Sequence, residues 1–389
     1  MEAGARVSLP PGQRARRAAM SSPMRKLGSL LRRVARGAPA LPPAGRNTRP
    51  GETVADQPAQ RFANRVWDER YSQTDPSGQL AHADCDPLDY TRHRFIYDHA
   101  ISEPLTGSRE RFWLDDIAER YLRPPADLVL SLGCGTAIHD EHLLSRGYAR
   151  RVIAYDMSQE AITAARRRLD ATPWGPAIEL RCGDPLADDL PTQGVDVVLV
   201  EAAIHHFVAI EDMFRLMHRV LKATGLLIYD EYVGPDHHQH PPELIALMDR
   251  INACLAEPYR RDFESGAPRE HVEPTPLEWM LSYDPTEGVH ASDILPLTYQ
   301  YFDVIDRRDY GSAILRPFFS RILTNWDFTD PRDQTIARLI ILLDHELTKR
   351  GEIPTHQTLV VARPRVVPGT RLSARDAARI GYAGWTPPR

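Results

Sequence analysis

The sequence predicts an α/β fold built around a doubly wound, mainly parallel sheet. An apolar run at 128–132 leads into a glycine turn, and a second apolar run at 151–156 ends in Asp156, 21 residues after Gly135. Glycine lets the backbone approach a ligand closely, and a strand-end carboxylate can bind two ribose hydroxyls. The arrangement therefore suits a cofactor that contains a nucleoside.

Helices with one apolar face alternate with the strands, as a sheet covered on both faces requires. Ser158 is expected to cap one such helix, and amphipathic patterns at 210–221 and 244–255 predict two more. A late helix over 331–349 should begin with Pro331 after an Asp330 N-cap. Its predicted buried stripe is Ile336, Leu339, Ile340, Leu343 and Leu347.

The glycine turn is not the one that binds a dinucleotide. The third glycine of a G-x-G-x-x-G motif would fall at position 138, which is Ile138. The observed Gly133-x-Gly135-x-Ala137 instead resembles the G-x-G-x-G loop of class I S-adenosylmethionine-dependent methyltransferases, with a small residue in place of the last glycine.

Three further motifs follow in the order found in that family. A short strand at 177–182 ends in Gly183-Asp184, an apolar strand at 195–201 leads to Ile204-His205-His206, and 220–231 resembles a helix end, a turn and the fifth strand. Together they cover about 126–235. The resemblance implies a Rossmann-like, seven-stranded sheet with an antiparallel last strand, for which 297–306 and 357–363 are the expected strands six and seven.

The resemblance also implies that S-adenosylmethionine is the cofactor, with Asp156 on the ribose and Asp184 near the adenine. The cofactor-binding residues expected from it are Gly133, Cys134, Gly135, Thr136, Ala137, Asp156, Met157, Gly183, Asp184 and Glu201.

Candidate catalytic residues lie at the carboxyl ends of strands four and five, where open α/β sheets place their active sites. Glu201 could accept a proton or contact the sulfonium side of the cofactor, and His205 and His206 are potential general bases. The alternative for both histidines is that they only cap the next helix. Glu231 is expected to face the mouth of the pocket together with Tyr232.

The chain divides into four regions by composition. The expected parts are a disordered basic segment at 1–60, a helical N-terminal cap at 61–125, the methyltransferase domain at 126–363 and a loose tail at 364–389. Within the domain we expect an irregular insertion at 257–296 and a helical insertion at 312–350. The segment 67–71, Trp-Asp-Glu-Arg-Tyr, resembles one that precedes the core in several small-molecule methyltransferases.

Charge, cysteines and hydropathy restrict the possible partners. Residues 1–50 carry a net charge of +10, so the rest sums to −15 in a chain of net charge −5, which argues against a nucleic-acid substrate. No apolar run is long enough to span a membrane, and four unpatterned cysteines suit a reducing cytoplasm. His237, His238 and His240 lack a metal-ligand spacing, so we expect no metal site.

The predicted function is therefore transfer of a methyl group to a small molecule, by O- or N-methylation of a sugar or natural-product intermediate. Two alternatives remain open at this stage. One is an enzyme that transfers the aminocarboxypropyl group or catalyses a cyclisation, and the other is a protein that binds the cofactor without catalysis. The sequence indicates neither the acceptor nor the oligomeric state.

Overall fold

The computed structural model describes residues 58–72 and 90–366, and its centre is one seven-stranded sheet. The strand order is β3-β2-β1-β4-β5-β7-β6, which confirms the predicted fold class. The strands are β1 (Val129–Leu132), β2 (Val152–Asp156), β3 (Ile178–Cys182), β4 (Val195–Glu201), β5 (Leu221–Tyr232), β6 (Phe302–Asp309) and β7 (Gln357–Pro364).

The direction of the strands fixes where a ligand can bind. β1 to β5 pair in parallel, whereas β7 runs antiparallel to both β5 and β6. The chain leaves β1 toward β2 on one side and returns on the other side with β4, so a crevice forms outside the carboxyl ends of β1 and β4. The glycine turn follows β1 and the histidine pair follows β4, which brings both to this crevice.

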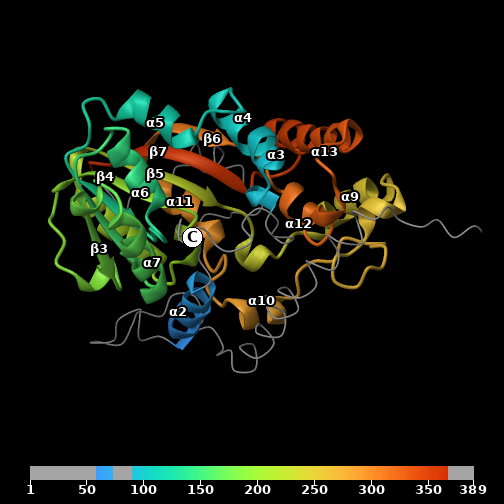
Figure 1. Cartoon of the computed structure of the whole chain (residues 1–389), viewed down its shortest axis with the longest axis horizontal. Helices are drawn as coiled ribbons and strands as arrows, with labels where there is room; N and C mark the ends of the chain where they lie inside the picture. The colour runs from blue at the N-terminus through green and yellow to red at the C-terminus, as the bar shows by residue number, and fades with distance from the viewer. Residues whose placement is uncertain (1–57, 73–89, 367–389) are drawn as a thin grey trace, which may run out of the picture.

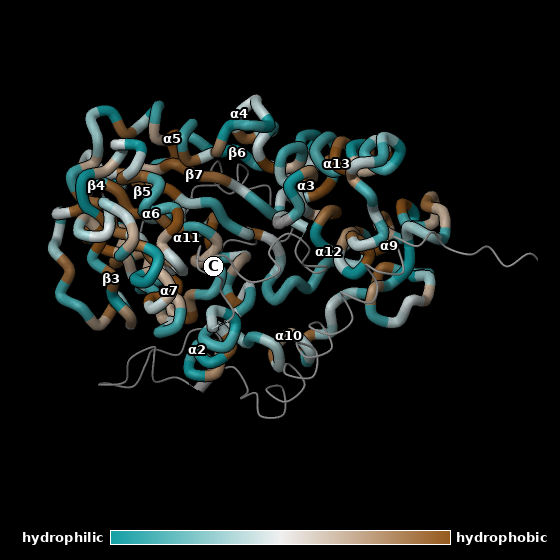
Figure 2. Tube along the Cα trace, in the orientation of Figure 1, coloured by the Kyte–Doolittle hydropathy of each residue, from teal (hydrophilic) through white to brown (hydrophobic). Residues whose placement is uncertain are grey.

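Alternate strand residues pack into two apolar layers, one on each face of the sheet. Helices α5 (Trp113–Tyr121), α6 (Ile138–Ser145) and α7 (Gln159–Leu169) contribute to one layer. Helices α8 (Ile210–Val220) and α11 (Ile294–Tyr301) contribute to the other. Figure 2 shows the resulting apolar segments along β4, β5 and β7 in the interior.

The remaining helices lie near the carboxyl ends of the strands or at one end of the molecule. Figure 1 shows α2 and α10 at the lower edge, with α2 beside α7, and it shows α9, α12 and α13 together on the right. Their bounds are α2 (Pro58–Tyr71), α3 (Arg94–Tyr97), α4 (Glu103–Thr106), α9 (Pro242–Ala253), α10 (Leu277–Tyr283), α12 (Leu315–Phe319) and α13 (Pro331–Lys349).

Two expectations for the C-terminal part were wrong. The expected strand at 297–306 begins five residues later, because Ile294–Tyr301 forms α11, whose Leu295 and Tyr299 pack against the sheet. The expected helix at 312–325 shortens to α12 and a 3₁₀ turn at Leu323–Asn325. In the first place a short apolar run fits a helix and a strand equally well, and packing decides between them.

Helix α13 has the predicted bounds, and Ile336, Ile340 and Leu347 of the predicted stripe pack against the core, but the buried face is rotated away from the other two positions. Asp330 caps it by accepting a hydrogen bond from the backbone N–H of Arg332. Leu339 and Leu343, expected inside, are 60% and 36% exposed, whereas Ala337 and Asp344 are buried. Asp344 accepts backbone hydrogen bonds from Ser312 and Ile314, so a polar contact determines how the helix is rotated.

Several expectations fall wholly or partly outside the described residues. The basic segment 1–60 is described only from Pro58, where α2 begins, and the tail 364–389 only up to residue 366. Among the helices that the structure describes, none is long and apolar enough to cross a membrane. Cys134, Cys182 and Cys254 are free thiols.

Candidate active site

The glycine turn after β1 tolerates no side chain at two positions. Gly133 and Gly135 have φ angles of 68° and 53°, in the left-handed region that favours glycine. A Cβ on Gly133 would collide with the side chain of Ala203, and one on Gly135 would lie 2.7 Å from the Tyr71 hydroxyl. The turn therefore packs directly against the segment after β4 and against α2.

Asp156 at the end of β2 connects this turn to the start of α7. Its Oδ2 accepts a hydrogen bond from the backbone N–H of Gly135 and its Oδ1 one from that of Ser158, each at 2.8 Å. Burial raises the pKa of Asp156, and the two backbone donors only partly offset the effect. Each oxygen keeps a lone pair for a further donor such as a ribose hydroxyl.

Helices α6 and α7 hold the rest of the turn. Ala137 takes a left-handed conformation with φ of 58° where it precedes α6. Arg168 of α7 donates a hydrogen bond of 2.8 Å to the carbonyl oxygen of Thr136 and also pairs with Glu141. Burial raises the pKa of the Cys134 thiol well above its usual value, which favours the neutral thiol over the thiolate.

A cavity lies between this turn, the segment after β4 and helix α2. Four predicted cofactor residues line it, namely Gly133, Asp156, Met157 and Asp184. Of the predicted catalytic residues, His206 lines it as well. The lining that the sequence did not predict comprises Gln60, Asn64, Trp67, Tyr71, Ser158, Pro185, Leu186, Ala202, Ala203, Phe207, Val208, Ala209, Met213 and Thr286.

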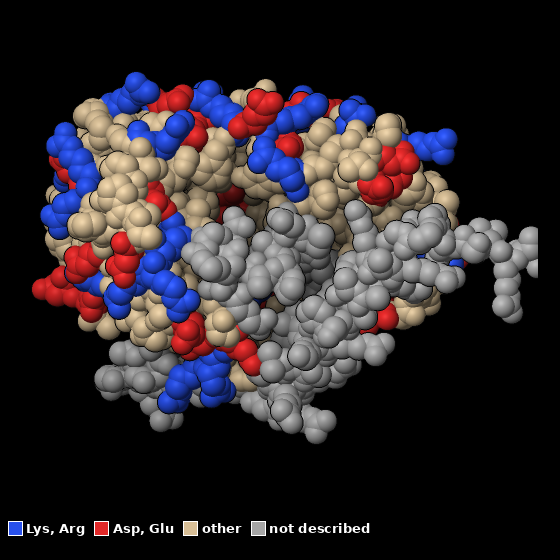
Figure 3. Space-filling model, in the orientation of Figure 1, with Lys and Arg blue, Asp and Glu red and all other residues tan. Residues whose placement is uncertain are grey.

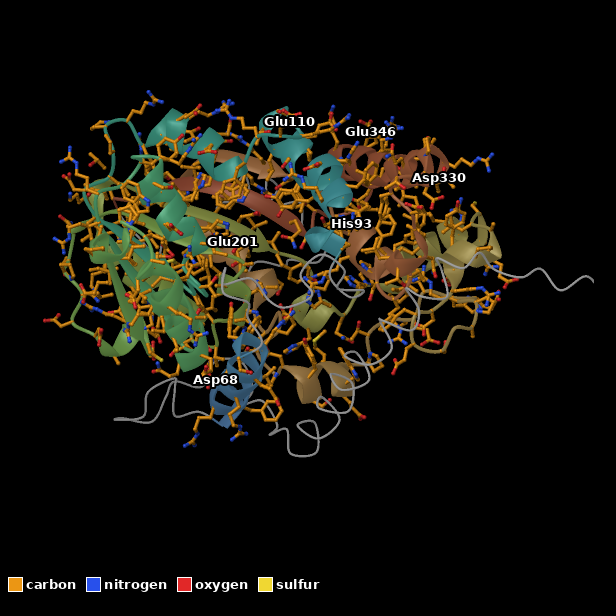
Figure 4. All side chains as sticks on the ribbon, in the orientation of Figure 1. Asp68, His93, Glu110, Glu201, Asp330 and Glu346 are labelled. Carbon is orange, nitrogen blue, oxygen red and sulfur yellow. The ribbon has the colours of Figure 1, made fainter. Side chains whose placement is uncertain are left out.

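Helix α2 is fixed across this cavity by its Trp-Asp pair. The Nε1–H of Trp67 donates to Oδ2 of Asp284 at 3.0 Å, and the Ser158 hydroxyl donates to Oδ1 of Asp68 at 2.7 Å. The Trp67 ring also packs edge-on against His206 with centroids 5.3 Å apart. Figure 4 shows Asp68 on α2, below the sheet. These contacts make the helix a wall of the cavity.

Glu201 belongs to a second group of side chains, which we call the carboxyl–tyrosine cluster: Tyr97, Glu201, Asp230 and Tyr310. Glu201 and Asp230 are register partners on β4 and β5, and the Tyr310 hydroxyl donates to Asp230 at 2.7 Å. Burial raises the pKa of Asp230 to about 8, although the Tyr310 hydrogen bond opposes this, and the charge of Glu201 raises it further.

Glu201 is the accessible member of this cluster. Its side chain is 39% exposed, and its carboxylate lies 3.6 Å from Nδ1 of His139. Figure 4 places Glu201 near the middle of the molecule, and Figure 3 shows a hollow in that part of the surface with acidic atoms inside it. Asp230 and Tyr310 are buried behind it.

The histidines after β4 differ in their surroundings. His205 is buried, and its Nδ1 lies 2.6 Å from Oε2 of Glu231. Burial disfavours the charged imidazolium, but the charge and hydrogen bond of Glu231 outweigh it and raise the pKa of His205. Burial and the neighbouring His205 lower the pKa of His206, whose ring is 4.3 Å from that of His205.

Glu231 and Tyr232 were expected to face the pocket, but the structure places them elsewhere. Both side chains are buried, with 1% and 2% of the residue exposed. The carboxylate of Glu231 accepts the backbone N–H groups of Ala203 and Ile204, and it also contacts His205. The reason is the direction of the turn after β4, whose free N–H groups point back at β5.

Sequence reasoning missed the residues that reach the site from the segment 284–287. Asp284, Thr286 and Glu287 are buried, and Nε2 of His238 donates a hydrogen bond of 2.8 Å to Oε1 of Glu287. Nothing in their local pattern signals this position, because they lie in the expected irregular insertion. Gln60 and Asn64 precede the Trp67–Tyr71 motif at helical spacing, a signal that could have placed them on the same wall.

Comparison with known proteins identifies the central part of the chain. The family model described as "Methyltransferase domain" matches residues 130–229, which contain the glycine turn, Asp156, Asp184 and Glu201. The chain carries a class I S-adenosylmethionine-dependent methyltransferase domain. The cofactor of that family is S-adenosylmethionine, as expected from the sequence.

Curated relatives of this domain are similar over about a third of the chain. The ubiquinone/menaquinone biosynthesis C-methyltransferase UbiE of Cereibacter sphaeroides is 24% identical over 143 residues, 37% of this chain and 57% of that protein. The demethylmenaquinone methyltransferase of Symbiobacterium thermophilum is 28% identical over 142 residues, 36% and 55% of the two chains. The chain thus aligns with little more than half of each relative.

Among solved structures, geranyl diphosphate C-methyltransferase from Streptomyces coelicolor A3(2) is 14% identical, with a TM-score of 0.43 over 81% of this chain and 100% of that one. The [4+2]-cyclase SpnF is 16% identical, with a TM-score of 0.37 over 65% and 81% of the two chains.

Proposed function

We propose that this methyltransferase domain binds S-adenosylmethionine in the cavity under α2 and transfers the methyl group to an oxygen or nitrogen of a small molecule. The observation that supports this proposal most strongly is the lining of that cavity. Gly133, Asp156, Asp184 and His206 follow four different strands, β1 to β4, and meet in one place. This is the crevice where open α/β sheets bind ligands.

The residues fit the parts of the cofactor. Asp156 offers two carboxylate oxygens for the ribose hydroxyls. Asp184 lines the same cavity and is assigned to the adenine amino group. Leu186 and Phe207 provide apolar surface for the adenine ring. Gly133 lines the same cavity, and its backbone is assigned to the amino acid portion of the cofactor.

The bound cofactor supplies a methyl group on a sulfonium, which leaves as a neutral thioether in an in-line displacement. The protein therefore has to align the acceptor, exclude water and remove one proton from a hydroxyl or amine. In our proposal Glu201 accepts that proton, because it is accessible and stands at the end of β4 beside the glycine turn. Trp67 and Tyr71 of α2 exclude water from the cavity.

The histidine pair forms the other wall in this proposal. His206 lines the cavity, and burial lowers its pKa, so it is neutral near pH 7. Glu231 positions His205 and the backbone at Ala203 and Ile204 rather than contacting the acceptor. Residue Glu231 thus retains a proposed role in catalysis, but through the groups that it orients.

A small acceptor suits the charge and the enclosure of the site. Outside residues 1–50 the chain sums to −15, which disfavours a polyanionic substrate. Helix α2 and the segment 284–287 cover the cavity. A sugar or natural-product intermediate with a free hydroxyl or amine matches this space. The Cereibacter sphaeroides relative is named a C-methyltransferase of ubiquinone/menaquinone biosynthesis, so carbon acceptors belong in the assay as controls.

The test is mass analysis of the nucleoside that remains after incubation with S-adenosylmethionine and a panel of hydroxylated, aminated and quinol acceptors. Formation of S-adenosylhomocysteine, lost in Glu201→Gln, supports the proposal. Methylthioadenosine would instead indicate transfer of the aminocarboxypropyl group. Tight binding with no product from any acceptor class would point to a binding protein.

A further inference from the structure

Two adjacent histidines and a distant glutamate converge beside the cofactor cavity. One ligand atom of each of His205, His206 and Glu287 lies within 4.8 Å of the others. Nε2 of His205 is 3.9 Å from Oε1 of Glu287, and Nε2 of His206 is 3.8 Å from Oε2. Both separations exceed a hydrogen bond. Around a tetrahedral metal ion with bonds of about 2.0–2.2 Å, neighbouring ligand atoms lie roughly 3.3–3.6 Å apart, so these atoms need to move only a few tenths of an ångström to bind an ion.

The other nitrogen of each ring is already held by a partner. Nδ1 of His205 lies 2.6 Å from Oε2 of Glu231, and Nδ1 of His206 lies 3.1 Å from the hydroxyl of Thr286. This leaves both Nε2 atoms directed at Glu287. Histidines that bind metals are typically oriented in this way, by a carboxylate or another polar group on the second ring nitrogen.

The glutamates are oriented as firmly as the histidines. Glu231 also accepts backbone N–H groups, including that of Tyr232 at 3.1 Å. Oε1 of Glu287 takes the 2.8 Å hydrogen bond with Nε2 of His238, which leaves Oε2 directed at His206. A site built on fixed side chains requires little rearrangement to bind an ion.

The local charge favours a cation. Glu231, Asp284 and Glu287 bring three carboxylates within reach of the two rings. Arg316 brings a guanidinium 3.4 Å from Oε1 of Glu287. A divalent ion between the rings and Glu287 would compensate the excess negative charge of this buried group, which is costly without such a partner.

We propose that His205, His206 and Glu287 form a binding site for one divalent first-row transition-metal ion. Two imidazoles and one carboxylate suit zinc, cobalt or iron better than magnesium or calcium, which prefer oxygen ligands. Three protein ligands leave a coordination position open, and His206 and Thr286 both line the cofactor cavity. We expect an oxygen atom of the methyl acceptor to occupy that position, and this part of the inference rests on the proposed function.

The test uses the full chain without a histidine tag, treated with a chelator and then titrated with Zn²⁺ by calorimetry and with Co²⁺ by visible absorption. We expect one ion per chain. His206→Ala and Glu287→Gln should each weaken Zn²⁺ binding at least about 100-fold. Glu231→Gln, which leaves all three ligands in place but alters the carboxylate that orients His205, should weaken it about 10- to 100-fold. The control His271→Ala, an exposed histidine that pairs with Asp249, should bind as the wild type does.

Neither cofactor nor acceptor is present in these titrations, so their result is independent of whether methyl transfer occurs. Thermal unfolding of each variant shows whether it is folded, and Glu287→Gln keeps the size of the side chain if His206→Ala fails to fold. Wild-type protein that binds no ion at one equivalent would overturn the proposal. Wild-type affinity in folded Glu287→Gln would overturn it as well.

Discussion

The β1–β3 side and the β4–β5 side of the crevice hold their functional groups in different ways. On the first side, Gly133 and Gly135 contribute backbone, and the carboxylate of Asp156 accepts hydrogen bonds from backbone N–H groups. On the second side, the groups are side chains such as His205 and Asp230, which are oriented by the side chains of Glu231 and Tyr310. A side chain added to a glycine of the first side should block cofactor binding. Substitutions on the second side should instead alter the protonation of its groups or the selectivity for the acceptor.

The largest effect is expected on the first side. Gly135→Val should abolish binding of S-adenosylmethionine, because the new side chain enters the space between the turn and Tyr71 and resists a φ of 53°. Calorimetry measures the loss, and circular dichroism shows whether the fold persists. Gly147→Val is the matched control, since Gly147 has a φ of 72° but open space around its Cβ position. If Gly147→Val lost the cofactor equally, backbone strain rather than occupied space would explain the result.

Asp156→Ala should lower the affinity for S-adenosylmethionine at least tenfold, because each charge-assisted hydrogen bond to a ribose hydroxyl contributes about 1.5–3 kcal/mol. The exposed Asp127, which pairs with Arg150, provides the control variant Asp127→Ala. Calorimetric titration compares the three proteins. Unchanged affinity in Asp156→Ala would mean that the ribose does not bind this carboxylate. The proposed role of the first side in cofactor binding would then be wrong.

Asp230→Asn tests the second side through pH. Because the folded protein raises the pKa of Asp230 from 3.8 to about 8, it binds a proton that the unfolded chain releases between these values. The free energy of unfolding should therefore fall as pH rises from about 4 to 8 and level off above 8. Asp230→Asn keeps an acceptor for the Tyr310 hydroxyl, and its free energy of unfolding should lack this decrease between about pH 4 and 8.

Urea unfolding at a series of pH values gives the measurement, and the control is Asp303→Asn, at a side chain that is 65% exposed. The two variants should differ by more than about 1 kcal/mol at pH 8. Equal pH profiles for Asp230→Asn and the wild type would mean that Asp230 is ionised in the folded protein and that the carboxyl–tyrosine cluster is not shielded as the structure indicates.

A smaller effect is expected at Ala137, which occupies the left-handed region. Ala137→Gly should raise the free energy of unfolding by about 0.5–1 kcal/mol, since relief of the left-handed strain exceeds the entropy cost of glycine. The control Ala165→Gly lies within α7, where glycine should destabilise by at least about 1 kcal/mol. Stability changes of the same sign in both variants would contradict the conformational argument.

No change in turnover is expected when residues 1–56 are removed. They precede α2, which begins at Pro58, and Gln60 is the first residue known to line the cavity. The rival hypothesis is that the charge of +10 on residues 1–50 attracts the segment to the acidic domain as a lid, an attraction that 0.5 M salt would screen. Turnover of the shortened and full chains at low and high salt distinguishes the two, and a large loss that salt reproduces would favour the lid.

The same contrast explains how much of the molecule was predictable. The strands around Gly135 and Asp156 were placed correctly because buried parallel strands, glycine turns and caps leave local patterns. The rotation of α13 was not predictable, since it depends on Asp344 bonding to backbone groups 30 residues away. The position of Glu287 beside His205 and His206 arises only when the chain folds, and no spacing in the sequence encodes it.

The central claim is that the cavity under α2 holds the cofactor, with both sides of the crevice contributing to it. A crystal structure of the full chain grown with S-adenosylhomocysteine tests it most directly. The account predicts the ribose hydroxyls on Asp156, the adenine between Leu186 and Phe207, and the sulfur directed toward Glu201. Ligand bound elsewhere, or an empty cavity at saturating ligand concentration, would contradict it.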